Sequence, residues 1–183
     1  MNHPLQKIPE NRVRGLFIVL LVVTLLIMVI MNMVGAPLMT HAAPSGIISY
    51  ELAGSALNSQ SILDSWDESA RQYAAFSLGL DYLFMLFYST TIALGCVWSG
   101  RVLAARAITL SVIGVPLAWG QWTAAVFDAV ENFGLTLILF GANGQIWAPV
   151  ARWCAIIKFG LIFLGITYSF FGLAISFAVK LKD

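Results

Sequence analysis

Four apolar stretches of this chain are each long enough to cross a lipid bilayer. They cover residues 15–34, 74–97, 107–140 and 153–179 of a 183-residue sequence that is 60% hydrophobic and only 10% charged. The hydrocarbon core of a bilayer is about 30 Å thick, which an α-helix crosses in about 20 residues. Because that core offers no water to backbone amides, such stretches must be helical. The sequence therefore predicts an all-α integral membrane protein in which residues 1–183 form one transmembrane four-helix bundle.

The third stretch, residues 107–140, is longer than one crossing requires. As a straight helix it would measure about 50 Å at 1.5 Å per residue. Gly114 and Pro116 offer a kink or a break, because proline lacks the amide hydrogen and its ring disturbs the preceding turn. Two interpretations follow: one tilted helix kinked near Pro116, or an interfacial piece before a shorter span that begins near Ala118. A turn is expected to start at Pro149, before the fourth span.

The connection between the first two spans, residues 35–72, is patterned as two short amphipathic helices. Ser45 is placed to cap the first of them, which would run to Ala53. The second collects its apolar side chains on one side, namely Leu57, Ile62, Leu63 and Trp66. Such helices would cover one end of the bundle or lie on the lipid interface.

Basic residues are distributed unequally between the two ends of the spans. One side carries Lys7, Arg12, Arg14, Arg101, Arg106, Lys180 and Lys182, and the other carries Arg71 and Arg152. Cytoplasmic loops are the ones enriched in lysine and arginine. Both termini are therefore predicted to be cytoplasmic, and residues 35–72 and 141–152 to face outward.

Ionisable side chains interrupt three of the apolar stretches. Asp81 lies in the second, Asp128 and Glu131 with Asn132 lie in the third, and Lys158 lies in the fourth. A charge at that depth costs roughly 2.5–3.5 kcal/mol on insertion scales, so it must be paired, hydrated or used. Counted from the span ends at 1.5 Å per residue, these groups share a level in the outer half of the membrane. The sequence therefore predicts one cluster.

Further polar and aromatic residues are candidates for the same site. Gln121 shares a helix side with the acids of the third span, and Tyr88, Trp119 and Trp122 would line the rim. Glu51 in the outer connection is either exposed or folded back onto the cluster, Arg71 or Arg152. The candidate residues for a buried charge network or a ligand site are Glu51, Asp81, Tyr88, Trp119, Gln121, Trp122, Asp128, Glu131, Asn132 and Lys158.

The cluster has a structural and a functional interpretation. In the first, Lys158 pairs with Asp81 or Glu131, and Tyr88 and Asn132 complete the hydrogen bonds. Three carboxylates against one ammonium would leave two negative charges in excess, so an acid must be protonated, hydrated or bound to a cation. The excess favours an acid-lined pocket, open to the outer side, for a lipid or a small polar or cationic ligand. The alternatives are a structural or assembly subunit, an ion-coupled transporter component, or a lipid-modifying enzyme that uses two carboxylates as acid and base.

Other chemistry finds little support in the sequence. The two histidines, His3 and His41, lie outside the spans, and Cys96 and Cys154 are isolated in apolar runs, as expected of free buried thiols. We therefore predict no metal site, no cofactor and no catalytic residue, and the absence of a basic stretch argues against nucleic acid. The expected partners are membrane lipids and the ligand. A small-residue stripe on the fourth span, Gly165, Ser169, Gly172 and Ser176, suits either a homo-oligomer or close packing within the monomer.

Five segments together resemble a known group of proteins. They are GIISYELAGS (46–55), LDYLF (80–84), LAWGQW (117–122), FDAVEN (127–132) and WCAIIKF (153–159). In combination they are similar to a family of small uncharacterised bacterial four-span membrane proteins, over most of the chain after residue 44. The resemblance implies a four-helix fold in the bacterial inner (plasma) membrane. It implies no particular activity.

Overall fold

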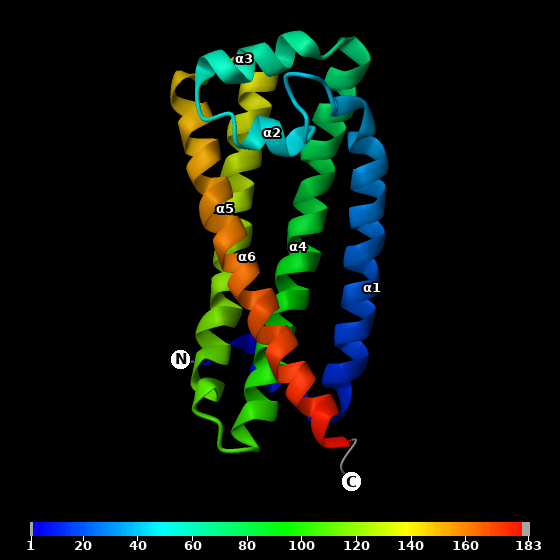
Figure 1. The fold of residues 1–183 in the computed structure, drawn as a ribbon, viewed down its shortest axis with the longest axis vertical. Helices are drawn as coiled ribbons and strands as arrows, with labels where there is room; N and C mark the ends of the chain where they lie inside the picture. The colour runs from blue at the N-terminus through cyan, green and yellow to red at the C-terminus, as the bar shows by residue number, and fades with distance from the viewer. Residues whose placement is uncertain (1, 181–183) are drawn as a thin grey trace. The chain divides into compact units, whose positions relative to one another are not determined.

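The computed structural model describes residues 2–180, and their side chains as far as residue 175. Lys182 and the side chains of Ser176 and Lys180, used above, lie outside the described residues. Over residues 2–180 every regular element is a helix. Four long helices dominate (Figure 1): α1 (Glu10–Gly35), α4 (Glu68–Ala104), α5 (Gly114–Leu139) and α6 (Gly144–Lys180). Each is long and apolar enough to cross a membrane, which confirms the all-α prediction and agrees with the four predicted spans in length and composition.

Short helices fill the connections. A 3-10 helix, η1 (Pro4–Lys7), precedes α1, and another, η2 (Ala36–Leu38), follows it. Two α-helices, α2 (Ile47–Glu51) and α3 (Ala56–Ser65), occupy the connection to α4. A third 3-10 helix, η3 (Thr109–Ile113), precedes α5.

The two prolines near span boundaries sit inside helices. Pro116 is the third residue of α5, where a helix has no partner for the amide hydrogen, and η3 directly precedes this helix start at Gly114. The expected turn at Pro149 is wrong, because α6 already begins at Gly144 and includes this proline. Asn143 explains the earlier start, since its Oδ1 accepts a hydrogen bond of 2.9 Å from the amide of Gln145. Asp67 similarly begins α4 at Glu68, with its Oδ1 2.7 Å from the amide nitrogen of Ala70.

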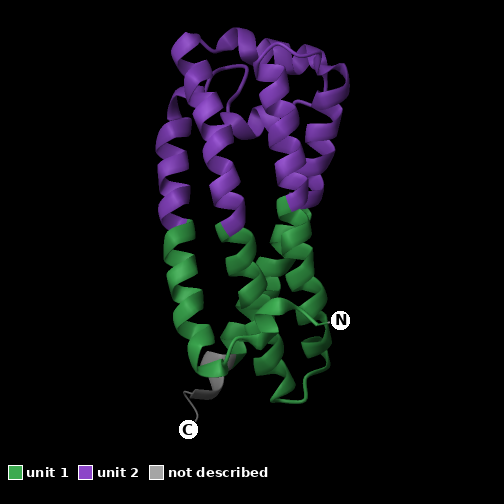
Figure 2. Ribbon diagram, turned by 180° about the vertical axis from the view of Figure 1, so that it is seen from behind, with its two compact units in different colours: residues 1–24, 87–125, 159–183 green, residues 25–86, 126–158 purple. Residues whose placement is uncertain are grey.

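Contacts divide the chain into two compact units, coloured separately in Figure 2. Unit 1 comprises residues 1–24, 87–125 and 159–183, and unit 2 comprises residues 25–86 and 126–158. Each long helix contributes a segment to both units.

Unit 1 is held together by close helix packing and a few buried hydrogen bonds. Its core consists of Ala93, Cys96, Val97, Leu103, Ala118 and Tyr168. The small residues of α6 pack inside this unit: the Ser99 hydroxyl donates to the Ser169 carbonyl at 3.0 Å, and a Cβ on Gly165 would clash with the Gln121 side chain. Gly165, Ser169 and Gly172, the described members of the small-residue stripe, therefore pack within the monomer. Arg101 fixes the N-terminal segment by donating to the carbonyls of Gln6 and Ile8 at 2.6 and 3.0 Å.

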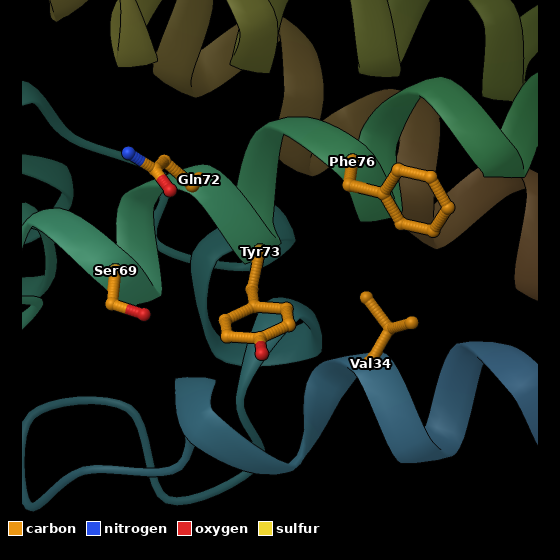
Figure 3. Close-up of a pocket in the computed structure, with 5 residues that line it drawn as sticks. All are labelled: Val34, Ser69, Gln72, Tyr73 and Phe76. Carbon is orange, nitrogen blue, oxygen red and sulfur yellow. The ribbon is translucent and has the colours of Figure 1, made fainter.

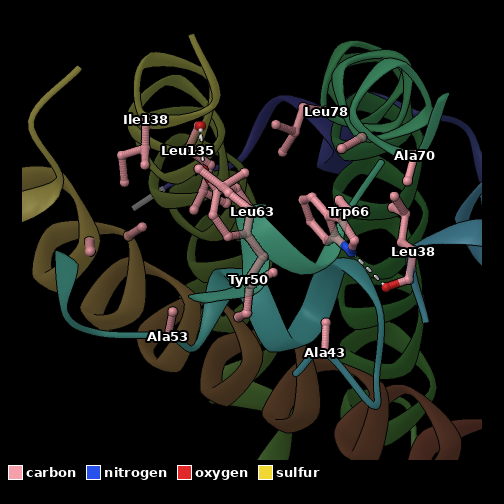
Figure 4. Close-up of a cluster of buried hydrophobic side chains, with 14 residues drawn as sticks. Leu38, Ala43, Tyr50, Ala53, Leu63, Trp66, Ala70, Leu78, Leu135 and Ile138 are labelled. Carbon is pink, nitrogen blue, oxygen red and sulfur yellow. Dashed lines mark hydrogen bonds between the residues drawn. The ribbon is translucent and has the colours of Figure 1, made fainter. Parts of the chain in front are cut away.

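Unit 2 contains the two short α-helices, which pack inward. Figure 4 shows the cluster of 14 buried apolar side chains to which they contribute. The Tyr50 hydroxyl donates to the carbonyl of Leu135 at 3.1 Å, and the Trp66 indole donates to the carbonyl of Leu38 at 2.9 Å. These bonds satisfy the polar atoms of both aromatic rings, so the connection forms part of the core.

The detail of these short helices differs from the sequence prediction. Ser45 does not cap α2; Gly46, at φ +57°, directly precedes the helix, and the Ser45 amide donates to the hydroxyl of Ser49 at 2.9 Å. The first helix ends at Glu51, before Ala53. In α3, Ser55 is the N-cap, and Leu57 is 80% exposed although its pattern placed it on the buried side. A first-turn residue of a helix can point away from the core without breaking the periodic pattern of the later turns.

Candidate functional site

Lys158 of α6 is surrounded by three acids within unit 2. Its Nζ lies 2.7 Å from Oδ1 of Asp128 and 2.9 Å from Oε1 of Glu131, both on α5. A third carboxylate oxygen, Oε2 of Glu51, lies 3.6 Å away. None of the four residues is more than 7% exposed. The predicted buried charge cluster is therefore confirmed, with Lys158 at its centre.

The spacing of α5 explains how one helix supplies two of these acids. Asp128 and Glu131 are three residues apart, so their side chains project from the same side of α5. Lys158 has three N–H donors, and two of them bind these acids with the short distances of charge-assisted hydrogen bonds.

Asp81 of α4 joins the cluster through an amide. The Nδ2 of Asn132 donates to Oδ2 of Asp81 at 2.5 Å, and both residues are buried. Of the two partners predicted for Lys158, the structure pairs it with Glu131, whereas Asp81 accepts this hydrogen bond. Glu131 and Asn132 are adjacent in α5 and bind different partners. Glu131 accepts from Lys158, and Asn132 donates to Asp81.

Glu51 is the acid that does not come from a long helix. It ends α2 and is 7% exposed, so the interpretation as an exposed loop residue is wrong and the folded-back alternative holds. Its neighbour Tyr50 anchors α2 to α5 and brings the carboxyl to Lys158. Burial raises the pKa of Glu51, and the nearby Lys158 opposes that rise.

The cluster contains more acceptors than donors. The carboxyl groups of Glu51, Asp81, Asp128 and Glu131 face a single ammonium group, which leaves three negative charges if all four are ionised. Three buried acceptor oxygens have no hydrogen-bond partner: Oε2 of Glu51, Oε2 of Glu131 and Oδ1 of Asn132. A buried acceptor without a donor costs about 1–3 kcal/mol. This arrangement suits a group that brings positive charge and several N–H donors.

Four of the predicted site residues belong to unit 1. Tyr88 is buried, and the Gln121 side chain donates to the carbonyl of Leu161 at 2.8 Å. The rings of Trp119 and Trp122 meet edge to face, with centroids 5.4 Å apart. Within unit 2 the structure brings together Glu51, Asp81, Asp128, Glu131, Asn132 and Lys158.

His3 is the residue that sequence reasoning missed. It is 1% exposed, and the centroid of its ring lies 4.7 and 4.5 Å from the ring centroids of Trp119 and Trp122. It also caps η1: Nδ1 accepts from the amide of Leu5, and the Gln6 side chain accepts from the His3 amide at 2.7 Å. The sequence signal was the capping pattern of a polar residue followed by proline and, three residues on, glutamine.

The remaining reactive groups give no second site. Cys96 and Cys154 are free and buried. Among residues 2–180, no group of three or more His, Cys, Asp or Glu side chains is arranged to hold a metal ion.

Four helices long and apolar enough to cross a membrane, and a charge cluster buried in one unit, indicate a polytopic all-α membrane protein. Comparisons with protein families, with curated proteins and with solved structures found no match to this chain. The resemblance to the bacterial four-span family therefore stays a prediction.

Proposed function

We propose that this protein binds a small amine, either free or as a lipid head group, at the buried cluster around Lys158. The observation that supports the proposal is the acceptor excess. Oε2 of Glu131 and Oδ1 of Asn132 have no hydrogen-bond donor, Oε2 of Glu51 has only the Lys158 ammonium group at 3.6 Å, and four carboxyl groups share one ammonium group. A primary ammonium group supplies one positive charge and three N–H donors, which matches the three oxygens.

The protein's orientation in the membrane decides the side from which the ligand enters. We place the protein in a bacterial inner membrane, as the family resemblance implies, with both termini in the cytoplasm, as the basic residues of the N-terminal segment and of the α4–α5 turn favour. The connection that carries α2 then faces outward. A ligand reaches the cluster from that side, because Glu51, at the end of α2, is the cluster acid that belongs to the connection itself.

The test compares two cations of equal charge. Purified protein in detergent is heated in the presence of ethylammonium, which has three N–H donors, or tetramethylammonium, which has none. We expect ethylammonium to raise the melting temperature in proportion to its concentration, as a ligand of the folded state does. Tetramethylammonium should not.

Matched variants locate the effect. Glu131→Gln removes a buried charge of the cluster and should abolish the ethylammonium shift, whereas Glu10→Gln, an exposed acid at the start of α1, should retain it. Equal shifts with both cations, or with both variants, would refute the proposal. If no amine shifts the wild type while loss of Lys158 unfolds it, the cluster is a structural network that fixes helix register.

A further inference from the structure

A groove runs between the end of α1 and the start of α4. Its first part is a cavity of about 430 Å³ lined by Val34, Ser69, Gln72, Tyr73 and Phe76 (Figure 3). A second cavity, of about 340 Å³, shares Ser69 and Tyr73 and adds Pro37, Thr40, Ser65, Asp67 and Ala70. Because two residues line both cavities, they form one continuous α1–α4 groove. Each part alone falls within the range of about 300–1,000 Å³ that small-molecule sites occupy.

The groove has Val34 and the Phe76 ring at one end, and an acid and two further hydroxyl groups at the other. Phe76 lies eight residues after the start of α4, about 12 Å along the helix, and Val34 lies in the last turn of α1. Thr40, Ser65 and Asp67 lie outside both helices, in the connection. Tyr73 and Phe76 are 42% and 57% exposed, so their rings offer apolar surface at the level of the spans. This order matches a phospholipid at the bilayer boundary, with acyl chains inward and head group outward.

Charge selects among head groups. Asp67 is the acid that lines the groove, and none of the described residues lining the two cavities is a lysine or an arginine. One oxygen of the Asp67 carboxylate caps α4 by accepting from the Ala70 amide, and the second remains for an incoming donor. Such a site attracts an ammonium group and disfavours a head group that is only anionic.

We infer that the α1–α4 groove binds one phospholipid with an amine-bearing zwitterionic head group of the phosphatidylethanolamine type. Its ammonium group contacts Asp67, the Ser69 hydroxyl contacts its phosphate, and an acyl chain follows Tyr73 and Phe76. This site is separate from the Lys158 cluster and is independent of which side of the membrane the connection faces.

Competition between two lipids tests the inference. Protein in detergent is supplied with equal amounts of phosphatidylethanolamine and phosphatidylglycerol, and bound lipid is counted by native mass spectrometry. We expect about a fivefold preference for phosphatidylethanolamine, the size of effect that one favourable surface charge pair produces. Asp67→Asn keeps the helix cap, since asparagine caps as well as aspartate, and should remove the preference.

A second variant tests the groove itself. Ser69→Trp fills the part common to both cavities and should lower occupancy by either lipid at least roughly fivefold. Leu86→Trp, at a 63% exposed position of the same helix outside the groove, should leave occupancy unchanged. Equal binding of the two lipids by the wild type, a preference that survives Asp67→Asn, or equal occupancy in the two tryptophan variants would overturn the inference. None of these outcomes bears on ethylammonium binding at the Lys158 cluster.

Discussion

Replacing Lys158 by methionine should destabilise the protein strongly. The substitution keeps much of the side-chain volume but removes the ammonium group that binds Asp128 and Glu131 at 2.7 and 2.9 Å and faces Glu51 at 3.6 Å. Removing one partner of a buried ion pair costs about 3–5 kcal/mol, because the other charge remains buried without compensation. For a chain of this length, that loss corresponds to a fall in melting temperature of roughly 6–20 °C.

The protein carries its own reporter for this experiment. Cys96 and Cys154 are free and buried, so a thiol-reactive fluorophore labels them only as the protein unfolds. Lys7→Met is the matched control, since Lys7 is exposed at the end of η1 and binds none of the cluster acids. A melting temperature of Lys158→Met equal to that of the control would refute the account of the cluster.

The pH dependence of the same variant gives a second check. Without the ammonium group, Lys158→Met buries carboxylates that only protons can neutralise, so its deficit should shrink as the pH falls. Adding Glu131→Gln to Lys158→Met should restore part of the lost stability at neutral pH. A deficit that is constant with pH, and unchanged by the second substitution, would mean that lost packing rather than lost charge causes the effect.

Three further substitutions, the first with a matched control, are tested by the same unfolding assay. Gly165→Ala should cost about 1–3 kcal/mol through its clash with Gln121, whereas Gly160→Ala, with nothing within 4 Å, should not; equal effects would contradict the packing of α6. Because burial raises the pKa of Glu51 above 4.5, the folded state holds that proton more tightly than the unfolded state, and wild-type stability should decline as the pH rises above that value. Glu51→Gln should reduce this decline, and an unchanged pH profile would contradict it. Tyr50→Phe should cost about 1 kcal/mol by removing the buried hydrogen bond to a main-chain carbonyl of α5, and a neutral effect would show that this bond does not stabilise α2.

The long helices were predictable because one physical constraint dominates them. A run of apolar residues in a bilayer has no alternative to a helix, so their number and approximate positions follow from composition. Their ends depend on single side chains. Asp67 and Asn143 cap α4 and α6 several residues before the apolar runs begin, and the apolar pattern contains no information about such caps.

The depth of the candidate site in the membrane was predictable from the sequence, but the pairing of its side chains was not. Asp81, Glu131 and Lys158 were placed at one level by counting residues along their spans, and the structure brings them into one cluster. The pairing of Asp81 with Asn132 depends on side-chain geometry that spacing does not specify. The position of Glu51 depends on a tertiary contact, because the hydrogen bond from the Tyr50 hydroxyl to the carbonyl of Leu135 holds α2 against α5.

The register of α5 against α6 has a consequence for how the chain enters the membrane. During synthesis Asp128 and Glu131 emerge 30 and 27 residues before the lysine that neutralises them, a delay of a few seconds at about 5–20 residues per second. Transferring α5 alone would place two acids in lipid, at roughly 2.5–3.5 kcal/mol each. The α5–α6 hairpin, joined by residues 140–143, is therefore the favourable unit of insertion. With Cys96 and Cys154 replaced by serine, a chain truncated after residue 143 should leave α5 exposed to a water-soluble label at Ala129→Cys, and a chain that includes α6 should protect it.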